Sequence, residues 1–202
     1  KEEGLEGVTF SPAVERVGSG ALAPHVLGRV GAMSPEQWEE LKRKGYAMEE
    51  TVGKDGAEAA FEEALHGTPG RRYVETAGSG WDTEPVAGKN VTLTLDKDLQ
   101  AAAQDALQAF LDGHPKASGG AVVALDVEDG GVLAMASLPG YDPETFSKQY
   151  GALAQDEGHP LMNRAIQGLY APGSAFKLVT ATAALEEGVL TPETKILDTG
   201  RY

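Results

Sequence analysis

The sequence predicts an α+β protein with two domains, in which short antiparallel strand pairs alternate with helices. Three observations lead to this prediction. The first 88 residues contain two short helices with clear start and stop signals, a long helix follows them, and two apolar strands then flank Asp129-Gly130. Asp-Gly between apolar runs is a strong β-hairpin signal. We therefore expect a small domain at residues 1–88 and part of a second domain at residues 89–202.

The two helices of the first domain are predicted from their ends. Ser34 is suited to cap a helix, Gln37 completes a capping box three residues later, and Gly45 ends the helix. Asp55 is the expected cap of a second helix, which ends at Gly67.

The remaining elements follow from hydrophobic periodicity. We expect a strand at 71–76 followed by a loop, an alternating strand at 91–95, a long helix at 97–111, strands at 120–126 and 132–137, a short helix around 145–150 and a helix at 174–187. The long helix carries an apolar stripe made of Leu99, Ala103, Leu107 and Phe110. The stripe should face the core.

Composition excludes several classes of function. The net charge is −14, which disfavours binding to nucleic acid or to anionic lipid. The chain has no cysteine, so thiolate catalysis and disulfides are excluded. Its four histidines are scattered, which disfavours a histidine-rich metal site, and no run of 18 apolar residues could span a bilayer. Both ends of the sequence look like cuts in a longer protein.

Ser174 and Lys177 are the candidate catalytic residues. A spacing of three places both side chains on one face at the start of the last helix. A serine hydroxyl becomes a good nucleophile when a base removes its proton, and a partly desolvated lysine can act as that base. The N–H groups at the start of a helix also suit a developing oxyanion. Considered alone, this tetrapeptide is more simply interpreted as a helix cap followed by a solvated lysine.

Four segments of the chain together resemble the class B penicillin-binding proteins, and they occur in the family's order. HVLGRVG at 25–31 and GYAMEETVGKDGAEAAFEEALHGTPG at 45–70 resemble the non-catalytic pedestal of that family. GAVVALDVEDGGVLAMASLPGYDP at 120–143 resembles the first strand pair of the transpeptidase domain. PLMNRAIQGLYAPGSAFK at 160–177 resembles the segment that enters the active-site helix.

The resemblance implies a pedestal at 1–88 and, at 89–202, the N-terminal portion of a β-lactamase/transpeptidase-like domain. Ser174 would be the acylated nucleophile, and Lys177 the general base or part of its proton relay. Gly173 would allow a tight turn before the serine, and Phe176 would pack into the core. Asn163 and Arg164 are interpreted as residues that order the loop and take no part in the chemistry.

The resemblance also implies the chemistry of the parent protein. It would be a D,D-transpeptidase that cross-links peptidoglycan stem peptides and binds β-lactams, without a metal or cofactor. It would work at the extracytoplasmic face of the bacterial membrane, held by an N-terminal anchor that this chain does not contain. A membrane-embedded glycosyltransferase is a further expected partner.

Two motifs of the superfamily are missing from the chain. Neither S-x-N nor K-[ST]-G occurs in the 202 residues. We therefore expect that this piece alone does not turn over substrate and that its sheet exposes an edge. Two other functions remain open at this point. The chain could be an interaction module for cell-wall synthases, or part of a serine β-lactamase or β-lactam sensor.

Overall fold

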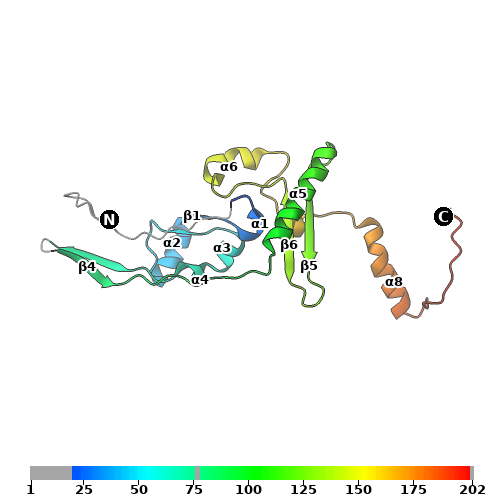
Figure 1. Cartoon of the computed structure of the whole chain (residues 1–202), viewed down its shortest axis with the longest axis horizontal. Coiled ribbons are helices and arrows are strands. Elements are labelled where there is room, and N and C mark those ends of the chain that lie inside the picture. The colour runs from blue at the N-terminus through cyan, green and yellow to red at the C-terminus, as the bar shows by residue number, and fades with distance from the viewer. Residues whose placement is uncertain (1–19, 76–77, 201–202) are drawn as a thin grey trace. The chain divides into compact units, whose positions relative to one another are not determined.

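The computed structural model describes residues 20–75 and 78–200 of the chain (Figure 1). These residues form two compact units, the first ending at Gln167 and the second beginning at Gly168. Helices alternate with two-stranded antiparallel sheets, which confirms the predicted α+β class. The predicted domain boundary between residues 88 and 89 falls within the first unit and stays a prediction.

The first unit begins with seven short elements. They are α1 (Pro24–Leu27), β1 (Val30–Ala32), α2 (Pro35–Leu41), the 3₁₀ helix η1 (Lys42–Lys44), β2 (Thr51–Gly53), α3 (Gly56–Ala60) and α4 (Glu62–His66). β1 pairs antiparallel with β2, and Gly31 lies opposite the buried Val52. α3 contacts both α1 and β2, and α4 contacts β2 as well, so the two helices pack against this sheet.

The predicted cap of α2 is present. The Ser34 hydroxyl accepts a hydrogen bond from the Gln37 N–H, and the Gln37 side chain accepts one from the Ser34 N–H, both at 3.2 Å. The helix continues into η1 and ends at Gly45, whose φ of 93° is the left-handed conformation that favours glycine. The structure thus confirms the helix that these residues predicted.

The second predicted helix is wrong in two respects. It breaks at Phe61 into α3 and α4, and the Asp55 side chain does not cap it. The Asp55 carboxylate instead accepts the Arg29 N–H at 2.9 Å and pairs with Arg29 Nε at 3.1 Å. This long-range ion pair takes the carboxylate away from the local cap because α1 and α3 lie against each other there.

A two-stranded ribbon follows, of which the sequence predicted only the first strand. β3 (Arg71–Glu75) pairs antiparallel with β4 (Gly78–Thr83). Glycine and serine are typical of turns, so the sequence predicts a loop where β4 lies. Pairing with β3 overrides that local preference.

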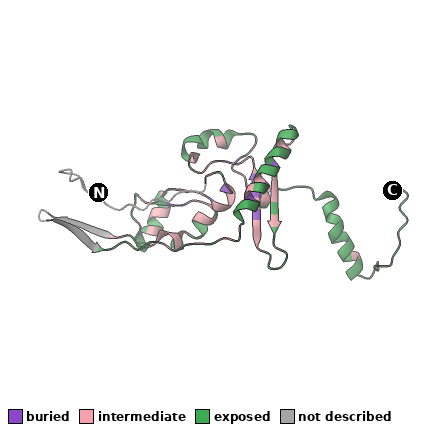
Figure 2. Ribbon diagram, in the orientation of Figure 1, coloured by how far each residue is buried: buried purple, intermediate pink, exposed green. Residues whose placement is uncertain are grey.

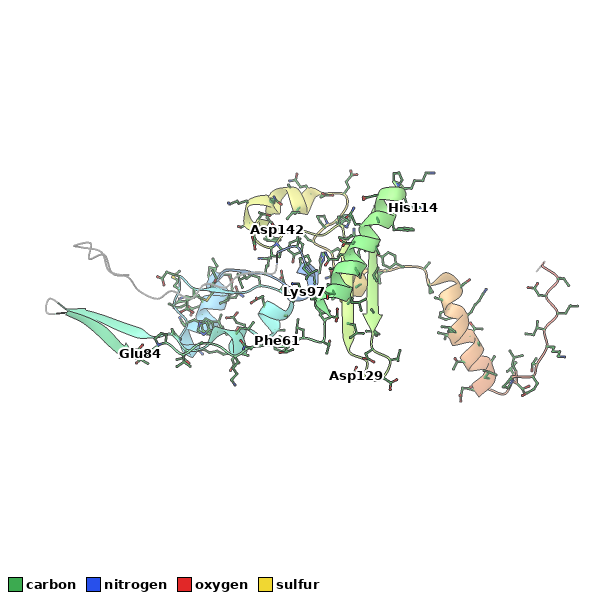
Figure 3. The ribbon with its side chains drawn as sticks, in the orientation of Figure 1. Phe61, Glu84, Lys97, His114, Asp129 and Asp142 are labelled. Atoms are coloured by element: carbon green, nitrogen blue, oxygen red, sulfur yellow. The ribbon has the colours of Figure 1, made fainter. Side chains whose placement is uncertain are left out.

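The core of the first unit lies between a long helix and a hairpin. α5 (Lys97–Gly113) packs on β6 (Val132–Leu138), which pairs antiparallel with β5 (Gly120–Leu125). Asp129 lies at the turn between the two strands (Figure 3). The buried residues of this core come from α5 and β6, and they are Ala103, Leu107, Ala134 and Ala136.

The predicted apolar stripe of α5 is only half right. Ala103 and Leu107 are buried, whereas Leu99 and Phe110 are exposed. Gln100 takes the inward position and is only 1% exposed. A period of 3.6 residues cannot distinguish an inward glutamine from a solvated one, so hydrophobic periodicity does not predict this exchange.

The strand predicted at 91–95 is also wrong, because these residues form no ladder. Only their end meets β6. The Thr94 hydroxyl donates to the Val132 carbonyl at 2.8 Å, and the Asp96 N–H donates to the Leu133 carbonyl at 2.9 Å. α5 begins immediately afterwards. The Gln100 side chain then binds both backbone groups of Met135, in the place that a strand would occupy.

Two further helices complete the first unit, and the second unit has two helical elements. The four are α6 (Phe146–Gln155), α7 (Arg164–Gln167), the 3₁₀ helix η2 (Gly173–Phe176) and α8 (Lys177–Glu186). In the second unit, every residue from 169 to 200 except Ala184 and Leu190 is exposed, as the colours of Figure 2 show. Among the described helices, none has the length and apolar character needed to cross a membrane.

Candidate active site

The segment that carries Ser174 begins with a tight turn. Pro172 has a φ of −67°, and Gly173 has a φ of 52°, which a side chain at that position would disfavour. The chain then enters η2, where Ser174 is the second residue. The turn confirms the expectation that glycine is needed immediately before the serine.

Ser174 and Lys177 lie in consecutive helical elements, the serine in η2 and the lysine at the start of α8. A 3₁₀ turn has three residues, so positions three apart share a face. Both residues are exposed. Among the described residues, no hydrogen bond joins the hydroxyl to the amine or either group to another side chain. The structure therefore places the pair on one stretch of helix without a hydrogen bond between the two groups, and their catalytic roles stay predictions.

The surroundings of the pair are open to solvent. Phe176, which we expected in the core, is 53% exposed, and Leu178 is 76% exposed. A lysine amine acts as a base where water is kept away from it. Residues 168–200 alone do not provide such a dry environment. An apolar helix of this kind is normally covered on most sides.

The loop before the serine segment is held much more firmly. Arg164 is only 7% exposed, and its guanidinium donates to the carbonyls of Gly158 and His159, the latter at 3.1 Å. Its backbone N–H donates to the Ser137 hydroxyl at 3.0 Å, and that hydroxyl donates to the Met162 carbonyl at 3.1 Å. Arg164 thus links the loop to β6 through hydrogen bonds.

Asn163 completes this arrangement from the start of α7. Its side-chain oxygen accepts the Ala165 N–H at 3.1 Å, and its own N–H donates to the Gln167 side chain at 2.9 Å. These bonds satisfy backbone groups at a helix end. Asn163 and Arg164 therefore order the loop, as the sequence analysis interpreted them.

Two residues around Arg164 were not predicted from the sequence. Ser137 accepts a hydrogen bond from Arg164, and Gly119 leaves space for the Arg164 side chain. A Cβ atom at Gly119 would lie 2.5 Å from Arg164 Nε and 2.6 Å from the Leu138 carbonyl oxygen. A glycine beside a strand is a known sign of close approach by another group. That signal was available in Gly119-Gly120, whereas nothing in the sequence marked Ser137.

Metal binding finds no support in the described part of the chain. Within residues 20–75 and 78–200, no cluster of three or more His, Asp or Glu side chains could hold a metal ion.

Two family models of known proteins match the two predicted parts of the chain. A family model for the penicillin-binding protein dimerisation domain matches residues 1–93, and a model for the penicillin-binding protein transpeptidase domain matches residues 120–202. The chain belongs to the penicillin-binding protein family. It has the pedestal of the class B members followed by part of a transpeptidase domain, which confirms the resemblance found in the sequence.

Curated relatives of the chain include peptidoglycan D,D-transpeptidases of two bacteria. The peptidoglycan D,D-transpeptidase MrdA of Salmonella typhimurium is 39% identical over 94% of this chain and 32% of its own length. MrdA of Escherichia coli K12 is 38% identical over 90% of this chain and 30% of its own length. The chain therefore spans about a third of the length of these relatives.

The chain is also similar to solved structures of penicillin-binding proteins. PBP2 of Pseudomonas aeruginosa, in complex with WCK 5153, matches with a TM-score of 0.73 and 35% identity, over 91% of this chain and 37% of that one. PBP2 of Helicobacter pylori, in complex with MreC, matches with a TM-score of 0.69 and 29% identity, over 91% of this chain and 36% of that one.

Proposed function

We propose that the chain is part of a peptidoglycan D,D-transpeptidase that cross-links stem peptides through an ester on Ser174. The main support is the position of Ser174. It follows a glycine turn and opens the helical stretch of the second unit, inside the residues that the transpeptidase model matches. The names of the relatives point to the same reaction.

The proposed reaction has two halves. Lys177 accepts the proton of the Ser174 hydroxyl as the oxygen attacks the carbonyl before the last D-alanine of a stem peptide. The peptide bond breaks, D-alanine leaves with the proton, and an ester on Ser174 remains. The amine of a neighbouring stem peptide then attacks the ester, which forms the cross-link and frees the serine. A β-lactam acylates the same hydroxyl when its ring opens. No metal or organic cofactor is required.

We further propose that the 202-residue chain by itself does not turn over substrate. It lacks S-x-N and K-[ST]-G, the two other elements of the superfamily site. Loss of one oxyanion-hole donor alone costs about 100- to 1,000-fold in rate.

The test is acylation by a labelled penicillin in a full-length protein that carries these residues. Mass spectrometry of its peptides should place the adduct on Ser174, and Ser174→Ala should abolish it. Lys177→Ala should slow the acylation strongly while the fold persists, because the hydroxyl loses its base. An adduct that survives Ser174→Ala would disprove the assignment of the nucleophile.

A second role, binding to partners through residues 1–88, is supported by one observation. A structure similar to this chain is PBP2 in complex with MreC. We propose that the pedestal contacts other cell-wall proteins at the extracytoplasmic face of the membrane, among them a membrane-embedded glycosyltransferase. Purified partners should bind the whole chain immobilised on a sensor, and the absence of binding would count against this role. A β-lactamase or β-lactam sensor is disfavoured by the dimerisation-domain match at residues 1–93.

A further inference from the structure

One loop of the first unit is bound at three consecutive carbonyl groups. The carbonyls of Gly158 and His159 accept hydrogen bonds from Arg164, as described above. The third carbonyl, of Pro160, lies 2.7 Å from Nε2 of His25, a residue 135 positions earlier in the chain. A carbonyl oxygen can only accept, so Nε2 carries the proton and donates. The loop is therefore held from one side by α7 and from the other by α1.

His25 is itself seated firmly. Its ring meets the Tyr141 ring edge-on, with centroids 5.2 Å apart and planes at 88°. The buried Tyr141 hydroxyl donates to the Pro24 carbonyl at 3.3 Å, which fixes α1 beside the loop that follows β6. His25 thus has little freedom to leave the Pro160 carbonyl.

The charges around His25 favour the neutral ring. Burial lowers the pKa of His25, and the positive charge of Arg164 acts in the same direction. The bond to Pro160 and the negative charge of Asp55 oppose these effects but are weaker than the burial. A neutral ring protonated at Nε2 is the form that the contact with Pro160 uses.

The bound loop has a conformation that needs support. His159 has a φ of 46°, in the left-handed region that residues other than glycine seldom adopt. Donors on both sides hold this residue and its neighbours in place. α7 follows directly, and residues 168–173 then lead from Gln167 to Ser174. The loop and α7, which packs on β5 and β6, are thus the last anchored elements of the first unit before the serine.

We propose that His25 is a positioning residue for Ser174, which acts from the pedestal by holding the Pro160 carbonyl and, through it, the anchored start of the serine segment. This inference rests on the proposed function. It differs from the role of Arg164, because His25 belongs to the part of the chain that carries no catalytic chemistry. The pedestal would thus contribute to the rate of acylation, besides any part it takes in binding.

The test measures acylation of the full-length protein by a labelled penicillin and separates the first-order rate of bond formation from the noncovalent dissociation constant. His25→Phe keeps a ring against Tyr141 but removes the donor. His25→Gln places an amide N–H near the original Nε2, whereas the shorter His25→Asn does not reach Pro160. His114→Phe is the matched control, because His114 Nδ1 donates to the Phe110 carbonyl at 2.7 Å from the exposed end of α5 (Figure 3).

We expect His25→Phe and His25→Asn to lower the rate of bond formation about three- to tenfold, the effect of one hydrogen bond, with the dissociation constant unchanged. His25→Gln should restore the rate to within about twofold, and His114→Phe should match the wild type. If His25→Phe does not fold, the comparison of His25→Asn with His25→Gln decides. Equal rates in these two variants, or a wild-type rate in His25→Phe, would overturn the inference. A wild-type protein without an adduct on Ser174 would instead overturn the proposed function.

Discussion

The loop at 156–163 and the segment at 168–200 are neighbours in sequence but differ in how their polar groups are satisfied. The buried Arg164, at the start of α7, donates to two carbonyls of the loop and to the Ser137 hydroxyl of β6, and His25 donates to a third carbonyl of the loop. In the segment after Gln167, Ser174 and Lys177 are exposed, and no hydrogen bond joins their side chains in the described part of the chain.

Under the proposed function, the groups that anchor the chain before the serine and the groups that react lie in separate parts of the protein. The carbonyls of residues 158–160 and the buried Arg164 have their hydrogen-bond partners within the first unit. If Ser174 and Lys177 have the proposed roles, they need surroundings that keep water away, and residues 168–200 do not supply them. The short motif then marks the proposed nucleophile, while its dry surroundings must come from outside these residues.

The largest expected difference between the two regions is in how much a leucine in each contributes to stability. Leu107 in the first unit is 8% exposed, whereas Leu178 in α8 is 76% exposed. Leu107→Ala should lower the free energy of unfolding of the chain by about 3 kcal/mol, because it leaves a cavity in the core. Leu178→Ala should change it by less than about 0.5 kcal/mol. Urea denaturation measures both, and equal losses would show that α8 is as well packed as the core.

The space around Arg164 gives the next largest effect. A methyl group at Gly119 would collide with Arg164 Nε and with the Leu138 carbonyl. Gly119→Ala should therefore cost about 2 kcal/mol in thermal or urea unfolding. Gly113→Ala is the control, since nothing lies within 4 Å of that position, and it should be neutral or slightly stabilising. An unchanged stability in Gly119→Ala would mean that the guanidinium is held less tightly than the geometry indicates.

A smaller loss is expected at the glutamine that binds β6. Gln100 donates to the Met135 carbonyl at 3.2 Å and accepts the Met135 N–H at 2.7 Å. Gln100→Leu leaves both groups without their partner and should cost about 1–2 kcal/mol. Gln108→Leu removes only an exposed bond to Asp112 and should be nearly neutral. Similar losses in the two variants would show that the contact with Met135 contributes nothing specific.

The smallest effect is a pH dependence that belongs to the loop. The pKa of His25 is lowered in the folded chain, mainly by burial, so folding favours the neutral ring. The resulting stability is present above the pKa of an unfolded histidine, near pH 6.5, and is lost as the pH falls through the lower folded value. The wild type should therefore lose more stability than His25→Gln between pH 7.5 and pH 5. Parallel curves would remove burial as the cause.

The sequence predicted the elements whose signals are local and missed those that depend on distant partners. The capping box at Ser34 and the hairpin at Asp129-Gly130 were predicted because the residues that form each of them lie within a few positions of one another. β4 was missed because its pairing with β3 overrides its glycine content. Asp55 was predicted to cap a helix because its ion-pair partner, Arg29, is distant in sequence and no local pattern indicates the pair.

The candidate site divides in the same way. Ser174 and Lys177 could be singled out from their spacing and from the segments that resemble the family. The loop-ordering role of Arg164 was also foreseen, but the donors and acceptors around it were not. His25 and Ser137 come from parts of the chain far from the loop in sequence, and only the fold brings them to it.

The central claim is tested most directly by comparing two proteins under one labelled penicillin. The 202-residue chain and a full-length protein that carries the same residues are treated alike, and the adduct is located by mass spectrometry. We predict an adduct on Ser174 in the full-length protein and none on the chain alone. Rapid labelling of Ser174 in the chain alone, or a full-length protein whose adduct lies on another residue, would contradict the account.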